Sequence, residues 1–128
     1  MFEYEIILIP VNINRDHWAL ITVELDKKLC RYYDSLQKNG EIVMENIVYF
    51  FETYLNGFQT NFQYFYEWDC LVEEVPKQTN NYDCGVFVCK FMDFISKGEK
   101  ISLDMGDMEY YRAEIGVEMT KEKIIRID

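Results

Sequence analysis

Three β-prone runs fill the first 36 residues and limit the fold more than any other feature of this sequence. The first, YEIILIPVNI at residues 4–13, is an almost continuous apolar run, which is typical of a strand covered on both faces, and pairing can lapse at Pro10. The second, HWALITVEL at 17–25, and the third, LCRYYDSL at 29–36, are separated only by the polar tripeptide DKK. Two β-prone runs joined by so short a connector predict a β-hairpin.

A helix and a fourth strand are predicted in the middle of the chain. In EIVMENIVYFFETYLNG (residues 41–57) apolar residues recur at helical spacing, and Asn56 and Gly57 provide a helix stop. The segment FQYFYEWDCLVEEV (62–75) returns to aromatic and β-branched residues in rough alternation and ends before Pro76. This second pattern predicts another strand.

The last third of the chain is predicted to be mainly helical. Apolar residues repeat at helical intervals from Cys84 to about Lys97, and Gly98 supplies the stop. Residues 107–125 predict a weaker helix, because Gly116 interrupts them and their apolar stripe is narrow.

Length and charge narrow the classes of protein to which the chain can belong. At 128 residues it is expected to form one α+β domain, residues 1–128, with helices packed on a mainly antiparallel sheet. Thirteen basic and 23 acidic residues give a net charge of −10, which argues against nucleic acid as a partner. No apolar run reaches the roughly 18 residues that a membrane span needs, so we expect no membrane partner and an intracellular location.

The cysteines predict neither disulfides nor a metal site. Cys30, Cys70, Cys84 and Cys89 could form two disulfides, but no secretory signal is visible, so four thiols are expected. There is no C-x-x-C pair and His17 is the only histidine, so the common zinc ligand patterns are absent from the sequence. We expect no metal and no cofactor.

Cys84 is the better candidate for a nucleophile. It begins the predicted helix, where free N–H groups and the positive end of the helix dipole favour a thiolate, whereas Cys89 lies in the middle of that helix. Gly85 leaves the backbone open to a substrate carbonyl, and Asp83 is predicted to cap the helix with its carboxylate. An inert buried cysteine beside a cap and a small residue is the alternative, and by residue type alone it is commoner.

His17 is the only candidate base, and strand pairing predicts its partner. If Leu25 pairs with Lys28 across the hairpin turn, Asp34 lies opposite Ala19, and His17 lies two residues from Ala19 on the same face. His17 and Asp34 are then diagonal neighbours, about 7 to 8 Å apart at the backbone. Taken singly, His17 is more commonly a surface histidine and Asp34 a turn residue. Their joint position favours an imidazole that is oriented by the carboxylate.

Two further residues could belong to the same site. Gln78 lies in the loop QTNNYD ahead of Cys84, where its amide could donate to an oxyanion together with the Cys84 N–H, or it could be an ordinary solvated glutamine. Trp18 points to the face opposite His17, where it could wall a groove or fill the core.

The order His17, Asp34, Gln78, Cys84 resembles the SUMO-deconjugating type of ubiquitin-like-protein-specific cysteine protease. The resemblance is carried by IPVNINRDHWALITVE, YYDSL and VPKQTNNYDCGVFVCKFMDF. It implies a papain-like cysteine protease fold with Cys84 as nucleophile, His17 as general base and acid, Asp34 as orienter and Gln78 as oxyanion donor. Trp18 would form one wall of the tunnel that admits a Gly-Gly tail.

The resemblance also implies a reaction and partners. The reaction is hydrolysis of the peptide or isopeptide bond after the Gly-Gly tail, the partner is SUMO or a related ubiquitin-like protein, and the expected protein is a monomer of the nucleus or cytoplasm. Family catalytic domains usually carry a helical lobe ahead of the first strand, whereas this sequence opens in MFEYEIILIP, so the domain is expected to be truncated at its N-terminal side. Alternatives are a pseudoprotease that binds a ubiquitin-like protein and, ranked lower, an acyltransferase that uses acyl-CoA.

Overall fold

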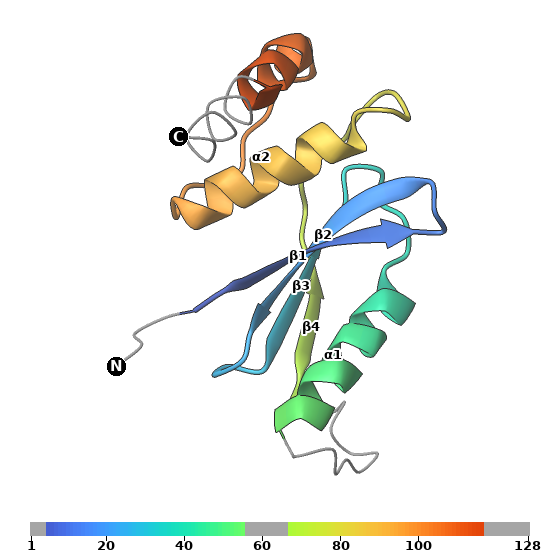
Figure 1. Cartoon of the computed structure of the whole chain (residues 1–128), viewed down its shortest axis with the longest axis vertical. Coiled ribbons are helices and arrows are strands. Elements are labelled where there is room, and N and C mark those ends of the chain that lie inside the picture. Colours follow the sequence, from blue (N-terminus) through green and yellow to red (C-terminus); the bar gives the residue numbers. More distant parts are fainter. Residues whose placement is uncertain (1–4, 56–66, 117–128) are drawn as a thin grey trace, which may run out of the picture.

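The computed structural model describes residues 5–55 and 67–116, which form a four-stranded sheet with helices on both faces (Figure 1). Segment 62–66 of the predicted fourth strand, helix-stop residues 56–57, and residues 117–125 of the predicted last helix lie outside the described residues. The described elements are β1 (Ile7–Ile13), β2 (His17–Glu24), β3 (Leu29–Tyr33), α1 (Glu41–Leu55), β4 (Asp69–Val72), α2 (Cys84–Ser96), the 3₁₀ turn η2 (Met105–Asp107) and a helix over 108–116.

The sheet has the strand order β1-β2-β3-β4. β1 pairs with β2 and β2 with β3 in antiparallel fashion, while β4 pairs with β3 in parallel. α1 covers one face and α2 the other (Figure 1). The predicted α+β class with a mainly antiparallel sheet is therefore confirmed.

Alternation along β2 gives the domain a hydrophobic core on each face of the sheet. Ile21 packs into the core under α1, whereas its neighbour Leu20 packs into the core under α2. The core under α1 has as its buried members Val11, Ala19, Ile21, Val23, Cys30, Tyr32, Met44, Val48 and Trp68. The core under α2 has as its buried members Leu20, Tyr33, Val75, Phe87, Val88, Phe91 and Met108.

The first strand differs from its prediction in length and in cover. β1 begins at Ile7 and forms an edge of the sheet, and Val11 is its only buried residue, so it is not fully covered on both faces. The predicted lapse at Pro10 is also wrong, because pairing continues to Ile13 opposite His17. An edge strand accommodates proline where the missing N–H would face away from the neighbouring strand.

The other predicted strand limits were too generous. The third strand ends at Tyr33, before Asp34, and the fourth covers only Asp69–Val72. The third strand ends where Asp34 turns inward to a buried histidine. The fourth strand pairs with β3 as far as Val72, and beyond it the Glu73 N–H still donates to the Tyr32 carbonyl at 2.9 Å. The helix predicted from Cys84 is confirmed, and Gly98 after its end adopts a φ of 69°, which glycine tolerates.

Candidate active site

The hairpin of β2 and β3 places His17 beside Asp34. The strands pair Glu24 with Leu29 and Leu20 with Tyr33, which is the predicted register. Beyond the last pair, His17 Nε2 lies 2.5 Å from Asp34 Oδ1, and both residues are buried. The predicted proximity of His17 and Asp34 is confirmed.

Three further donors fix the Asp34 carboxylate. The Tyr32 hydroxyl donates to Oδ2 at 2.6 Å, the Leu36 N–H to Oδ1 at 2.8 Å and the Lys38 N–H to Oδ2 at 3.0 Å. Burial, together with the hydrogen bond to Asp34, raises the pKa of Tyr32 above its ordinary value, so its hydroxyl remains a donor. The carboxylate is thus a fixed acceptor that orients the imidazole of His17.

This hydrogen bond determines which ring nitrogen of His17 is available for chemistry. Because Asp34 accepts a hydrogen bond from Nε2 of His17, the neutral ring carries its proton on Nε2. Nδ1 is then the basic nitrogen. Nδ1 is buried and has no hydrogen-bond partner within residues 5–55 and 67–116. Such an unpaired buried nitrogen is suited to taking a proton from a nearby acid.

Cys84 is the first residue of α2, and its sulfur lies against β2. The backbone N–H of Trp18 donates to Cys84 Sγ at 3.5 Å, so the sulfur contacts the chain one residue beyond His17. Cys84 is 7% exposed, whereas Cys89 on the same helix is exposed. The fold therefore brings the N-terminus of α2 to the start of β2, where the sequence places the candidate base.

Asp83 precedes α2 but does not cap it as predicted. Its side chain makes no capping hydrogen bond to the helix. Instead, Oδ2 accepts from Asn80 Nδ2 at 2.7 Å, and Oδ1 accepts from the guanidinium of Arg112. Both carboxylate oxygens are thus engaged by donors outside α2, and the charged guanidinium of Arg112 is a stronger donor than a backbone N–H.

Gln78 is buried rather than solvated, and its amide is anchored at both ends. Its Oε1 accepts from the Ser35 hydroxyl, its Nε2 donates to the Asn80 carbonyl at 2.7 Å, and its backbone N–H donates to the Ser35 carbonyl at 3.0 Å. A primary amide carries two N–H donors, so one remains for another acceptor. Gln78 is consequently held next to the turn that carries the Asp34 carboxylate.

The two predicted substrate-binding residues, Trp18 and Gly85, are accessible to different extents. Trp18 is 44% exposed, so the core-filling alternative does not hold for it. A Cβ at Gly85 would meet no atom within 4 Å. Gly85 also borders a hollow of about 620 Å³ whose lining residues are Tyr82, Gly85, Val86, Cys89, Arg112, Ile115 and Gly116.

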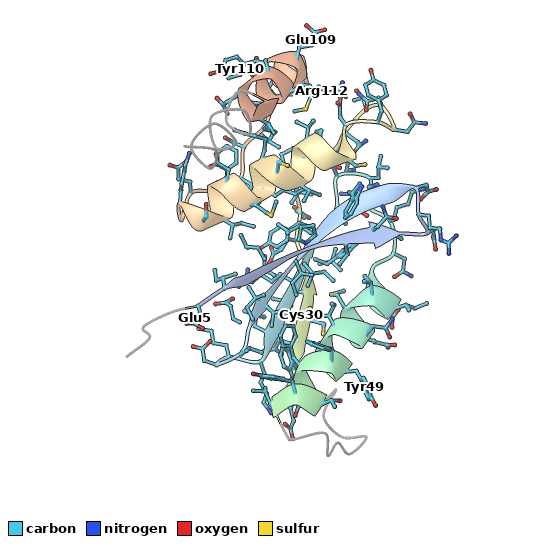
Figure 2. The ribbon with its side chains drawn as sticks, in the orientation of Figure 1. Glu5, Cys30, Tyr49, Glu109, Tyr110 and Arg112 are labelled. Carbon is cyan, nitrogen blue, oxygen red and sulfur yellow. The ribbon has the colours of Figure 1, made fainter. Side chains whose placement is uncertain are left out.

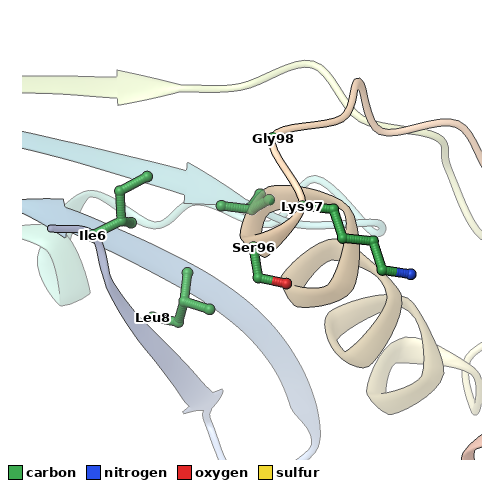
Figure 3. Close-up of a pocket in the computed structure, with 6 residues that line it drawn as sticks. Ile6, Leu8, Ser96, Lys97 and Gly98 are labelled. Atoms are coloured by element: carbon green, nitrogen blue, oxygen red, sulfur yellow. The ribbon is translucent and has the colours of Figure 1, made fainter. Parts of the chain in front are cut away.

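A second hollow, of about 460 Å³, lies between the start of β1 and the end of α2 and is lined by Ile6, Leu8, Ile95, Ser96, Lys97 and Gly98 (Figure 3). Within the described ranges, no group of three or more His, Cys, Asp or Glu side chains could hold a metal ion. Nor does any helix there have the length and apolar character needed to cross a bilayer.

Sequence reasoning missed Tyr32, Ser35, Asn80 and Arg112. Tyr32 and Asp34 are two residues apart along the predicted third strand, which puts both on one face and could have revealed their contact. No local pattern links Arg112 to Asp83, since 29 residues separate them.

Comparisons with known proteins agree on one family. Residues 1–126 match the profile of the Ulp1 protease family, C-terminal catalytic domain. Human sentrin-specific protease 2 is 29% identical over 128 residues, which cover 98% of this chain and 22% of that protein. The putative ubiquitin-like-specific protease 1B of Arabidopsis thaliana is 30% identical over 124 residues, which cover 94% of this chain and 36% of that protein.

Solved structures give the same result. The C-terminal Ulp1 protease domain in complex with Smt3, the yeast ortholog of SUMO, superposes with a TM-score of 0.63 at 28% identity, over 84% of this chain and 48% of that chain. The SUMO protease Ulp1 with its catalytic cysteine oxidised to a sulfonic acid gives 0.66 at 26% identity, over 84% of this chain and 49% of that chain. The chain thus spans about half of these solved chains.

Proposed function

Since the chain belongs to the Ulp1 protease family, C-terminal catalytic domain, we propose that it is a cysteine peptidase that hydrolyses the bond after the Gly-Gly tail of SUMO or a related ubiquitin-like protein. The bond is a peptide bond in a precursor and an isopeptide bond in a conjugate. The observation that carries the proposal is the hydrogen bond from His17 to Asp34 next to the contact between the Trp18 N–H and the Cys84 sulfur.

The proposed acylation step uses four side chains. His17 Nδ1 takes the proton of Cys84, and the thiolate attacks the carbonyl carbon of the terminal glycine. The oxyanion that forms accepts hydrogen bonds from the Cys84 N–H and the free N–H of Gln78. As the C–N bond breaks, His17 returns its proton to the leaving amine, which leaves a thioester on Cys84, while Asp34 stabilises the imidazolium.

The proposed deacylation step reverses these roles. A water molecule gives a proton to His17 and attacks the thioester carbonyl, the C–S bond breaks, and the sulfur is released as the thiol after proton return. Trp18 and Gly85 are proposed to bound the path of the Gly-Gly tail, because one presents an exposed aromatic ring and the other leaves open space beside the nucleophile.

The proposal also covers the oligomeric state and the cellular location of the protein. We propose that residues 1–128 act as a monomer in the nucleus or cytoplasm, without nucleic acid. Support comes from the free thiols of all four cysteines, which suit a reducing compartment, and from the net charge of −10, which disfavours phosphate backbones. Size-exclusion chromatography with light scattering should give the mass of one chain.

An irreversible thiol-directed probe that carries a SUMO tail tests the nucleophile. The wild-type chain should be labelled and Cys84→Ala should not, while Cys89→Ala, which removes an exposed thiol from the same helix, should be labelled like the wild type. Equal labelling of the wild type and Cys84→Ala would reject Cys84 as the nucleophile. SUMO binding by both proteins without cleavage of any conjugate would instead favour a binding module.

A further inference from the structure

The loop before the nucleophile is tied to the helix of residues 108–116 by one side chain. The Arg112 guanidinium donates to Asp83 Oδ1 and lies 5.1 Å from the centre of the Tyr82 ring. The Asp83 side chain is 4% exposed and that of Arg112 is 46% exposed. Figure 2 shows Arg112 on this helix, which lies beside α2.

The charge of Asp83 matters because this residue directly precedes Cys84. A carboxylate close to a thiol opposes formation of the thiolate, whereas a cation paired with that carboxylate removes the opposition. The carboxylate could also swing to cap α2 by accepting from the second or third N–H of the helix, which would place its negative charge at the helix end that carries Cys84. Both effects are avoided in this structure, because Arg112 and Asn80 together engage both of its oxygens.

We propose that Arg112 is a positioning residue for the nucleophile. It neutralises the Asp83 carboxylate and holds it away from the N-terminus of α2, so that the Cys84 thiolate forms at a lower pH than it would without the Arg112 charge. The inference rests on the proposed function in that it gives Arg112 a part in the same site. It is an effect on charge, however, and can be measured without substrate.

Three parts of the described chain place ionisable side chains near Cys84. On β2, His17 is adjacent in sequence to Trp18, whose N–H donates to the Cys84 sulfur, and its Nε2 is bonded to Asp34. Asp83 comes from the loop before α2, and Arg112 from the helix of residues 108–116. Removal of the Arg112 charge therefore leaves Asp83 as the uncompensated neighbour while the pair of His17 and Asp34 is unchanged.

Site-resolved alkylation of the full chain with iodoacetamide tests the inference. The rate at Cys84 is followed against pH by mass spectrometry, and its midpoint is compared between proteins. Arg112→Gln should raise the midpoint by about one pH unit, the usual scale for one close charge. Arg112→Lys, which keeps the charge, should remain near the wild type, and the double variant Asp83→Asn with Arg112→Gln should return to it.

A matched control separates charge from loss of helix docking. Glu114→Gln removes the 2.9 Å ion pair between Glu114 and Lys90, which ties the same helix to α2, but leaves Arg112 and Asp83 in place. Its Cys84 midpoint should equal that of the wild type. An equal shift in Glu114→Gln, no shift in Arg112→Gln, or a shift that persists in the double variant would overturn the inference.

Two further measurements keep the test decisive. If Arg112→Gln does not fold, Asp83→Asn alone should lower the Cys84 midpoint, because it leaves the Arg112 charge unopposed; an unchanged or higher midpoint would contradict the inference. Cleavage of a SUMO fusion is measured on the same proteins, and Arg112→Gln should lower kcat more than it changes KM. Absence of cleavage by the wild type would count against the proposed function, whereas the alkylation midpoints would still decide the role of Arg112.

Discussion

At the scale of single residues, the Asp34 carboxylate organises the candidate site. It accepts from His17, from the Tyr32 hydroxyl and from two backbone N–H groups. A carboxylate with four donors has one stable orientation, and the imidazole bound to it inherits that orientation.

Replacement of Asp34 by asparagine should abolish most of the proposed peptidase activity. The amide can present an N–H to His17, which favours the wrong tautomer, so we expect kcat/KM for a SUMO fusion to fall on the order of 10³-fold or more. Asp16→Asn is the matched control, because Asp16 is adjacent to His17 in sequence but exposed. An equal loss in both variants would show that Asp34 has no special role.

Among the thiols of Cys30, Cys84 and Cys89, that of Cys30 should be the least reactive. It is fully buried on the sheet face covered by α1 (Figure 2), and burial raises its pKa to about 12. At pH 8 it is therefore a neutral thiol, and iodoacetamide should modify it only after unfolding, whereas the exposed Cys89 should react in the native chain. Modification of Cys30 at the rate of Cys89 would contradict its burial.

The sequence was informative about these residues to the extent that local rules govern them. Strand alternation and hairpin pairing place His17 beside Asp34, and the start of a periodic apolar stripe marks Cys84. The same rules gave Asp83 the wrong partner, because a helix cap is the best local option whereas the real partner, Arg112, belongs to another helix. Contacts that depend on tertiary packing have no signature in spacing.

At the scale of secondary-structure elements, Gly40 permits α1 to start against β3. Its carbonyl accepts from the Met44 N–H at the first turn of α1, and a Cβ at this position would lie 2.5 Å from the Tyr32 ring. The close approach of helix and ring therefore requires glycine, for reasons of space rather than of backbone angle.

Gly40→Ala should destabilise the domain and disturb the site. Displacement of the Tyr32 ring should reduce the free energy of unfolding in urea by about 1–3 kcal/mol, the usual cost of overpacking. It should also weaken the hydrogen bond from Tyr32 to Asp34 and reduce activity. Gly106→Ala is the control, because a Cβ there would find only ordinary contacts, the nearest at 3.5 Å.

Docking of the 108–116 helix on α2 should depend on pH through Glu114. Hydrogen bonds from Lys90 and then Tyr110 lower the pKa of Glu114 below its ordinary value of 4.5. Its contribution to stability is therefore fully present above pH 4.5 and is lost as the pH falls through the lower pKa of the folded state. The melting temperature of the wild type should exceed that of Glu114→Gln at pH 7, and the difference should close in acid; a constant difference would reject this assignment.

At the scale of the whole molecule, β2 joins two cores that would otherwise be separate. Leu20 belongs to the core under α2 and Ile21 to the core under α1. Because adjacent residues of one strand serve both cores, loss of either core should release β2 and with it the other core. We therefore expect cooperative unfolding of both halves.

Core truncations on the two faces test this cooperativity. Val48→Ala, under α1, should cost about 2 kcal/mol, and Phe91→Ala, under α2, about 3–5 kcal/mol. In each variant, unfolding curves from circular dichroism and from tryptophan fluorescence should still coincide, since Trp68 reports on the core under α1. Separate transitions in Val48→Ala or Phe91→Ala would show that the two cores unfold independently.

The fold class was predictable because most elements have strong local patterns, but their limits and exposure were not. The apolar run of β1 looks like an inner strand, yet topology leaves it at an edge with Pro10 exposed. β4 is shorter than its pattern and pairs in parallel with β3, which depends on where α1 returns the chain rather than on the strand's own residues.

The double use of β2 also constrains how its length can vary. One extra residue between His17 and Leu20 would turn every later side chain of the strand to the opposite face of the sheet, so that Leu20 would face α1, Ile21 would face α2 and the imidazole would lose its alignment with Asp34. Insertions and deletions should therefore be accepted only in the turns at either end of this strand, and divergence within it should proceed by substitution alone.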